Sequence, residues 1–314
     1  MSSVLCVILN WRTPEMTLKA AQSAIAAMKG IDGAITIVDN DSQDGSFEAM
    51  TRAAADWPRV RVLQAGRNGG YGAGNNHGIR AGLPDGSKPD YVYVLNSDAF
   101  PEPDAIRHLV SYLDEHPDVG FAGSHIHGPE GEPHTTAFRF PTITSEFEGA
   151  ARTGPISRLL KHAIVAPPLP TVTTRVDWFA GASVLMRQSM LDQIGLFDER
   201  FFLYFEETDL FLRAARAGWT AVYVVESRVM HIGSVSTGMK NWGRVPSYWF
   251  ASRRHYFEKN HGRFYALAAT LAHVAGLGVH GMRVLVQRKK PHTPPYFLRD
   301  LVKHEWGTRR PQEN

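Results

Sequence analysis

Three carboxylates occur within four residues, at Glu206, Glu207 and Asp209, directly after the apolar and aromatic run FFLYF. Burial beside aromatic rings and mutual repulsion raise the pKa of a carboxyl group toward neutrality. A carboxylate of this kind is suited to act as a general base near neutral pH. Glu206 and Asp209 lie one helical turn apart, so an acidic helix start with Arg213 as a partner is the alternative interpretation.

A second candidate centre follows the apolar run VYVL, where Asn96 and Asp98 occur. A lone carboxylate at a strand end suits a hard divalent cation, Mg²⁺ or Mn²⁺, that bridges a diphosphate. His231 ends a later apolar run, and a histidine there can bind a metal or a phosphate. A helix-capping role is the alternative for Asp98.

Polar clusters also end two further apolar runs, at Asn10 and at Asp39–Asp41. The glycine run NGGYGAGNN, residues 68–76, has neither the position and spacing of a dinucleotide fingerprint nor the Lys-Ser/Thr of a Walker loop. Its backbone N–H groups could approach a sugar or a phosphate, and a tight strand-to-helix turn is the alternative.

The elements that must position these residues alternate between strand and helix. Buried strands are predicted at residues 4–9, 34–38, 60–63 and 91–95, with helices at 14–28, 47–55 and 71–81 between them. This alternation predicts an α/β fold with a mostly parallel, Rossmann-like sheet covered on both faces. Ligands collect at the carboxyl ends of such strands, where the polar clusters lie.

The pattern changes after residue 100. The sequence predicts a helix at 101–115, loops and edge strands at 123–141, an excursion at 151–170, a strand at 176–187, a helix at 206–217 and a last strand at 221–225. Nothing divides residues 1–260, so we expect one catalytic domain there and a C-terminal helical extension at 261–314.

Composition excludes several classes. A chain of 314 residues with 43% hydrophobic residues is neither disordered nor fibrous, and the single Cys6 excludes a disulfide framework. Residues 261–314 carry nine Lys or Arg against three acids, whereas residues 1–260 carry 25 against 28. An acidic body with a basic, apolar tail is not typical of a nucleic-acid-binding protein. The first residues, MSSVLCVILNW, read as a buried strand and not as a signal peptide.

The tail segment 263–286 is apolar and long enough to suggest a membrane span. His273, His280 and Gln287 recur on one face, which favours an amphipathic helix at a membrane surface, followed by the basic residues 288–290. A helix packed on the catalytic domain, or on a second copy in a homodimer, is the alternative.

Taken together, these segments resemble the family 2 inverting nucleotide-sugar glycosyltransferases of the GT-A fold, and most of all their rhamnosyltransferase-like branch. The resemblance covers about residues 3–240 and rests on an ordered set of motifs: VILNW, VDNDSQDGS, NGGYGAGNN, VLNSDAFPEPDAI, WFAGASVLMRQ, FDERFFLYFEETDLFLRAARAGW and HIGSVSTG. It implies transfer of a sugar, with rhamnose a candidate, from a dTDP-, UDP- or GDP-linked donor to a saccharide or polyprenyl-linked saccharide in cell-surface polysaccharide synthesis. It also implies a cytoplasmic enzyme, with the inner face of the cell membrane as a candidate location.

The resemblance further assigns residues to roles. Glu207 is the expected base, with Glu206 and Asp209 as the other candidates, and Asp98 and His231 are the expected metal ligands for Mg²⁺ or Mn²⁺. Trp178 is expected beside the donor sugar and the acceptor. The expected donor-binding residues are Asn10, Asp39, Asp41, Asn68, Gly70, Asn76, Asn96, Gly181 and Ala182.

The sequence departs from the family pattern at two points. Asn96 stands where the metal motif usually has a first aspartate, and the acidic pair is Glu-Glu where Glu-Asp is common. A sugar-phosphate nucleotidyltransferase is one alternative function, but NWRTPEM after the first strand is not its glycine- and arginine-rich loop. A non-catalytic sugar-nucleotide or glycan-binding module is the other alternative, and the intact acids at 206–209 disfavour it.

Overall fold

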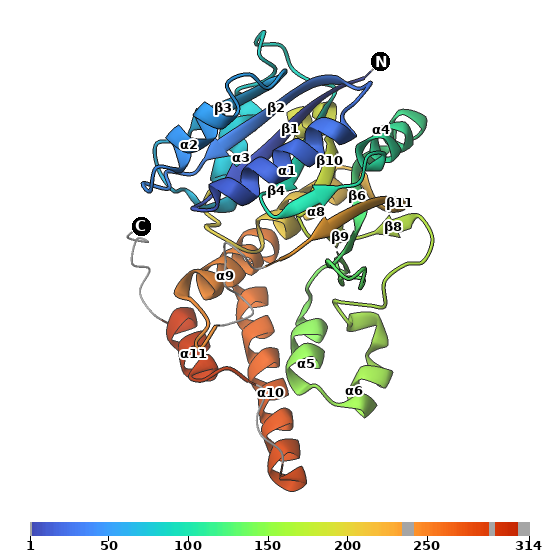
Figure 1. Ribbon diagram of the computed structural model, residues 1–314. Coiled ribbons are helices and arrows are strands. Elements are labelled where there is room, and N and C mark those ends of the chain that lie inside the picture. The colour runs from blue at the N-terminus through green and yellow to red at the C-terminus, as the bar shows by residue number, and fades with distance from the viewer. Residues whose placement is uncertain (1, 234–241, 289–292, 307–314) are drawn as a thin grey trace.

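A mixed β-sheet forms the centre of the computed structural model, which describes residues 2–233, 242–288 and 293–306. The order of its strands is β3-β2-β1-β4-β10-β6-β11-β5, with β8 paired to β11 (Figure 1). The nine strands are β1 (Ser3–Asn10), β2 (Asp32–Asp39), β3 (Val60–Gln64), β4 (Tyr91–Asn96), β5 (Ala99–Pro101), β6 (Val119–His127), β8 (Thr174–Val176), β10 (Ser183–Arg187) and β11 (Thr220–His231).

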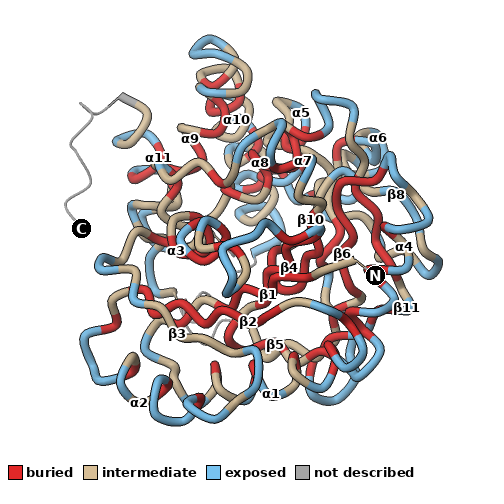
Figure 2. Tube along the Cα trace, turned by 90° about the horizontal axis from the view of Figure 1, so that it is seen from above, coloured by how far each residue is buried: buried red, intermediate tan, exposed pale blue. Residues whose placement is uncertain are grey.

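Helices cover both faces of this sheet, and each face has its own apolar core. One face is covered by α1 (Pro14–Ala27), α2 (Ser46–Ala53) and α4 (Ala105–Glu115), and the other by α3 (Gly70–Arg80), α7 (Gln188–Ile194) and α8 (Glu206–Arg216). Because both faces are covered, Val4–Ile8 of β1 are 0% exposed, and Figure 2 shows the buried residues concentrated along the central strands. The predicted α/β class with a mostly parallel sheet is confirmed.

Two segments differ from the sequence prediction. Residues 119–127 form β6, an interior strand, although loops and edge strands were predicted from residue 123 onward. The apolar alternation is missing there because the Phe179 ring packs over Gly123, where a Cβ atom would collide with it. The predicted strand at 176–187 is divided into the end of β8, β9 (Trp178–Phe179) and β10; β9 pairs with β7 (Ala137–Phe138) in a separate small sheet.

A second group of helices lies below the sheet in Figure 1, and α10 extends farthest from it. The group comprises α5 (Ile143–Ala151), α6 (Gly154–Leu159), the 3₁₀ turn η1 (Lys161–Ala163), α9 (Ser247–His261), α10 (Arg263–Gln287) and α11 (Phe297–Trp306). Within it, Arg253 is 1% exposed and pairs with Glu146 at 2.8 Å, and Glu146 also accepts a hydrogen bond from His273. This network joins α5, α9 and α10.

The predicted boundary after residue 260 stays a prediction, and residues on both sides of it share one core. Phe201 and Leu212 pack in the same cluster as Tyr256, Ala266 and Ala269. Of the predicted basic run 288–290, Lys289 and Lys290 lie outside the described residues, as do residues 234–238 of the last resemblance motif.

Candidate active site

The first part of the site lies at the carboxyl ends of β1 and β2, where Asn10 and Asp39 are register partners. The Asn10 amide donates to Asp39 Oδ1 at 2.7 Å, and the Ser42 hydroxyl donates to the same oxygen at 2.6 Å. Asp39 is fully buried, and its Oδ2 accepts the backbone N–H of Ser42. Asp39 therefore orders the loop after β2, which presents the half-buried Asp41 with a positive φ of 59°. Contact of Asp39 and Asp41 with a nucleotide base stays a prediction.

The glycine run lies against the segment that precedes the acidic residues. Gly70 has a φ of +85°, and a Cβ atom on it would overlap the carbonyl of Phe202. That carbonyl accepts the N–H of Tyr71 at 3.0 Å, while Asn68 Oδ1 accepts the N–H of Gly70 at 3.1 Å and the Asn40 amide at 2.9 Å. Only glycine fits at residue 70. It therefore allows both the strand-to-helix turn and the close packing of this turn against the segment before the acidic residues.

The start of α8 places two carboxyl groups side by side at a helix N-terminus. Tyr204 and Phe205 both have a φ of 69°, a left-handed conformation that is strained for aromatic residues. The strained turn directs Glu206 inward, where it is 1% exposed, and leaves Glu207 half-buried. Burial raises the pKa of Glu206 well above its ordinary value, and the charge of Glu207 adds to the increase; burial also raises the pKa of Glu207.

Glu207 is held against the backbone at Gly181. The N–H of Gly181 donates to Glu207 Oε1 at 3.1 Å, and the Tyr71 hydroxyl donates to the Gly181 carbonyl at 2.8 Å. A Cβ atom on residue 181 would lie 2.5 Å from Tyr71 Oη and 2.6 Å from Glu207 Oε1. The absence of a side chain at Gly181 therefore makes room for the carboxylate and the phenol together.

Asp209, predicted as a third candidate base, does not face this site, and the structure corrects the prediction. Its carboxylate is 0% exposed and accepts hydrogen bonds from Arg213 at 3.0 Å, Lys259 at 2.7 Å and Asn260 at 2.9 Å. The side chain joins α8 to α9. The alternative interpretation, an acidic helix residue paired with Arg213, is correct for Asp209.

The candidate metal ligands meet because β11 pairs with β5, which places His231 opposite Ala99. His231 Nε2 donates to Asp98 Oδ1 at 3.0 Å, and the N–H of Gly233 donates to Oδ2 at 3.0 Å. Burial alone would raise the pKa of Asp98, but the hydrogen bond and charge of His231 outweigh it and lower that pKa. The Asn96 amide lies 3.4 Å from His231 Nε2.

These two side chains can hold a small divalent cation once His231 has released its Nε2 proton. Carboxylate oxygen is the ligand type that Mg²⁺ and Mn²⁺ prefer, and Asp98 supplies it, whereas His231 Nε2 donates its proton to Asp98 here and would have to lose it before binding a cation. In the described part of the chain, no group of three or more His, Cys, Asp or Glu side chains forms a metal site. Asp98 and His231 would therefore need oxygen atoms from a diphosphate and water to complete a coordination shell.

Backbone contacts join the metal-ligand pair to the acidic pair. The N–H of Asn96 donates to the carbonyl of Ala182 at 3.0 Å, and Ala182 follows Gly181, the partner of Glu207. Burial raises the pKa of Tyr71, and the charges of Glu207, Glu206 and Asp98 raise it further. The charges of both groups therefore act on the Tyr71 phenol, and their membership of one site stays a prediction.

Asn76 is the other predicted residue with a different role. Its amide donates to the Phe197 carbonyl at 2.9 Å and to Glu199 at 3.0 Å, while its Oδ1 accepts the N–H of Phe197 at 3.1 Å. The side chain is 0% exposed, so both ends of the amide are used inside the protein. The structure thus corrects the predicted donor contact of Asn76 to a structural contact between α3 and the segment before α8.

Sequence reasoning did not single out Tyr71, Asn40 or Ser42, although all three lie inside quoted motifs. A tyrosine within a glycine run is a signal that could have identified Tyr71, because an aromatic ring there must pack against another segment. Asn40 and Ser42 carry no comparable signal, since Asn and Ser are ordinary turn residues.

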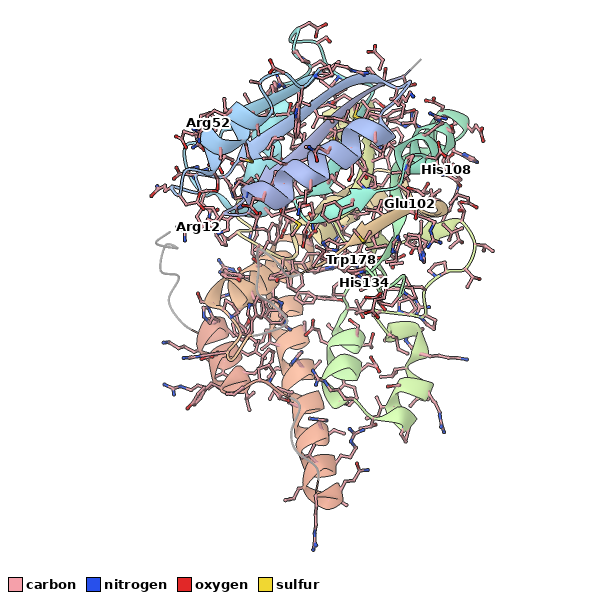
Figure 3. The ribbon with its side chains drawn as sticks, in the orientation of Figure 1. Arg12, Arg52, Glu102, His108, His134 and Trp178 are labelled. Atoms are coloured by element: carbon pink, nitrogen blue, oxygen red, sulfur yellow. The ribbon has the colours of Figure 1, made fainter. Side chains whose placement is uncertain are left out.

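Trp178 and His134 lie below the sheet in Figure 3. The Trp178 indole N–H donates to the Arg139 carbonyl at 2.9 Å, and its ring stacks on Phe138 at 4.5 Å. The His134 ring lies edge-to-face with His231, with 6.3 Å between their centroids. Trp178 is therefore held by Arg139 and Phe138, and its place beside the donor sugar and the acceptor stays a prediction.

Comparison with known proteins decides the family. Residues 2–257 match the family model described as glycosyltransferase like family 2. The chain belongs to this family. This glycosyltransferase is 31% identical over 260 residues to the N-acetylglucosaminyl-diphospho-decaprenol L-rhamnosyltransferase of Mycobacterium tuberculosis, an alignment that covers 76% of this chain and 79% of the relative. The match decides against the nucleotidyltransferase and the non-catalytic module as alternatives.

Solved structures show that this glycosyltransferase has the GT-A fold. GalNAc-T7 with UDP, GalNAc and Mn²⁺ aligns with a TM-score of 0.61 at 13% identity, over 97% of this chain and 54% of that one. This chain thus spans about half the length of GalNAc-T7. A mannosyltransferase from Pyrobaculum calidifontis in complex with GDP-Man and Mn²⁺ aligns with a TM-score of 0.55 at 13% identity, over 96% of this chain and 87% of that one.

Proposed function

We propose that this glycosyltransferase transfers rhamnose, with inversion, from a dTDP-linked donor to a polyprenyl-diphosphate-linked saccharide. The family match and the named activity of the mycobacterial relative support the sugar and the acceptor class. The observation that carries the site assignment is the run of contacts from Glu207 through Gly181, Ala182 and Asn96 to the Asp98 region. It supports the proposal that a proton acceptor and a diphosphate-side carboxylate serve one site.

Glu207 is the general base in this proposal. Its carboxylate is half-buried and fixed by the Gly181 N–H, whereas Glu206 is almost fully enclosed. As the acceptor hydroxyl oxygen bonds to the anomeric carbon, the bond from that carbon to the diphosphate oxygen breaks, and Glu207 takes the hydroxyl proton. The raised pKa of Glu207 strengthens it as a proton acceptor relative to an exposed carboxylate.

Asp98 and His231 are the proposed ligands of Mg²⁺ or Mn²⁺, and Asn96 lies beside them. A divalent cation bound there would supply Lewis-acid stabilisation of the negative charge on the leaving nucleoside diphosphate. Before a cation binds, His231 and the Gly233 N–H hold the Asp98 carboxylate ionised and oriented; His231 would give up its Nε2 proton to become a ligand. Asn10, Asp39, Asp41, Asn68 and Gly70 form the proposed nucleotide side.

We also propose that the enzyme works at the cytoplasmic face of the cell membrane. The one free cysteine, Cys6, is buried in β1, which is consistent with a reducing compartment. In the described part of the chain, α10 alone is long and apolar enough to cross a membrane, by length and composition. A polyprenyl-linked acceptor is itself held in a membrane, so an enzyme that uses it must work at the surface.

The test is a donor and acceptor screen with the full chain. The protein is incubated with dTDP-rhamnose, or with UDP- and GDP-linked sugars, and with N-acetylglucosaminyl-diphospho-polyprenol and Mn²⁺ or Mg²⁺. We expect nucleoside diphosphate release and a glycosylated lipid with dTDP-rhamnose. Glu207→Gln should retain dTDP binding but lose about 10²–10⁴-fold in rate, as for loss of a general base. Glu130→Gln, an exposed residue, is the control. Full activity of Glu207→Gln, or release with none of the donors, would refute the proposal.

A further inference from the structure

The end of the molecule farthest from the sheet carries exposed apolar side chains on two helices. Leu159 on α6 is 79% exposed, and on α10 Met282, Leu285 and Val286 are 64%, 79% and 82% exposed. Figure 1 shows α6 and the C-terminal end of α10 at this end of the molecule. We call residues 152–161 and 281–288 the distal pole. Single exposed apolar residues are common on proteins, whereas a group of this kind at one end marks a contact surface.

Two contacts hold the halves of the distal pole together. The Arg283 guanidinium donates to the carbonyl of Arg152, the residue that ends α5 and leads into α6. About two turns earlier on α10, Gly276 packs so closely on α5 that a Cβ atom would lie 2.5 Å from the Phe147 carbonyl oxygen. The side chains of α6 and the end of α10 are therefore presented by one connected scaffold.

All charged side chains of the distal pole are basic. Residues 152–161 contain Arg152, Arg158 and Lys161, residues 281–288 contain Arg283 and Arg288, and neither segment contains Asp or Glu. The nearby acids of α5 are turned inward: Glu146 pairs with Arg253, and Glu148 accepts a hydrogen bond from Ser157. Basic residues mixed with protruding apolar ones are typical of surfaces that bind anionic lipid headgroups.

Helix α10 cannot span a bilayer while it is packed on the rest of the protein as observed. All buried residues of α10 lie between Ala266 and His280, and Thr270 bonds to the buried Arg253. Residues 281–288 are the part that projects, and its helical residues, 281–287, extend about 10 Å at about 1.5 Å each. The hydrocarbon core is about 30 Å thick. The projecting end is therefore long enough to enter the headgroup region and too short to cross the membrane.

We infer that the distal pole docks this glycosyltransferase on the surface of an anionic lipid bilayer, with α6 and the end of α10 contributing together. The inference extends the proposed function, because it specifies the surface through which the enzyme meets a membrane-held acceptor. A second copy of the chain is a less suitable occupant. A two-fold interface places the same patch against itself, and basic side chains would then face basic side chains.

The test measures binding of the full chain to sedimented vesicles of phosphatidylglycerol and phosphatidylcholine. We expect binding that requires phosphatidylglycerol and weakens in high salt. Leu159→Ser combined with Leu285→Ser should lower the partition coefficient roughly tenfold, because apolar burial in the bilayer is lost. The matched control is Phe264→Ser, because Phe264 is 92% exposed at the other end of α10. It should bind like the wild type.

Charge is tested separately. Arg158→Gln combined with Lys161→Gln should weaken binding about 25-fold, at about fivefold for each basic residue near an anionic surface. Lys19→Gln combined with Arg52→Gln, on the exposed surfaces of α1 and α2, is the charge-matched control; Figure 3 shows Arg52 on the sheet part of the molecule, away from α10. All variants replace exposed side chains, and unchanged thermal melting confirms that they fold.

Two results would overturn the inference. The first is that the wild type does not sediment with anionic vesicles, or that the distal-pole variants sediment to the same extent as the wild type. The second is a concentration-dependent dimer, seen by analytical ultracentrifugation, that the Leu159→Ser and Leu285→Ser substitutions dissociate. Binding of dTDP, measured on the same variants in solution, does not depend on the distal pole. A failure of docking is thereby distinguished from a failure of the proposed function.

Discussion

Substitution of Gly181 by alanine should strongly reduce the reaction rate of a protein that still folds. The added Cβ atom would lie 2.5 Å from Tyr71 Oη and 2.6 Å from Glu207 Oε1, so an ordinary contact of 3.4 Å requires these oxygens to retreat by about 0.9 and 0.8 Å. Both atoms are at the ends of side chains, which makes the shift feasible. The folding cost is about 1–3 kcal/mol, as for other overpacked sites.

The catalytic cost comes in addition to the folding cost, because the displaced carboxylate is the proposed base. A misplacement of about 1 Å in a catalytic group lowers rates by roughly 10²-fold. We therefore expect the kcat of Gly181→Ala to fall about 100-fold in a diphosphate-release assay, with dTDP binding retained and Tm lowered by only a few degrees. Gly149→Ala is the matched control, since nothing lies within 4 Å of its Cβ position. Wild-type kcat in Gly181→Ala would show that this contact does not position the base.

Three further predictions concern the carboxylates. Glu206→Gln should raise Tm progressively between pH 5 and pH 8. The folded-state pKa of Glu206 is raised above its ordinary value of 4.5, so the stability that its neutral carboxyl group contributes is present in full below pH 4.5. As the pH rises toward the folded-state pKa, the wild type loses up to about 1.4 kcal/mol of this stability per pH unit, whereas the Gln variant does not. A Tm difference independent of pH would contradict this prediction. Asp209→Ala should destabilise the protein by about 3 kcal/mol in denaturant unfolding, because Arg213 and Lys259 lose a buried carboxylate, while Lys259 keeps its pair with Asp198; an unchanged midpoint would contradict the structural role. Asp98→Ala should abolish the increase in Tm that Mn²⁺ causes in the presence of dTDP, whereas a retained increase would place the cation elsewhere.

Much of the fold could be predicted from local pattern. The continuous apolar runs of β1, β2 and β4 and the Pro14 start of α1 were predicted within one or two residues, because burial on both faces and the fixed φ of proline act locally. The interior position of β6 could not be predicted. Its Gly123 is explained by the ring of Phe179, a residue 56 positions away.

The site was predictable to a similar degree. Residues at strand ends, such as Asn10, Asp39 and Asp98, were identified because parallel strands bring their carboxyl ends to one edge. Asp209 and Asn76 were misassigned because their partners lie on distant segments: Lys259 on α9 for Asp209, and Phe197 before α8 for Asn76. Residue type alone does not show whether an amide or a carboxylate faces a ligand or another part of the chain.

The amino-acid sequence by itself determined the α/β class, the order of the elements up to about residue 115 and the family, because periodicity and motif spacing are properties of the chain. Tertiary structure alone decided which of three neighbouring acids is accessible, since that depends on the strained turn at Tyr204 and Phe205 and on the space left by Gly181. It also decided how much of the apolar C-terminal helix projects from the protein. The reason is physical: exposure depends on what packs against a side chain, and those contacts come from segments far away in the sequence.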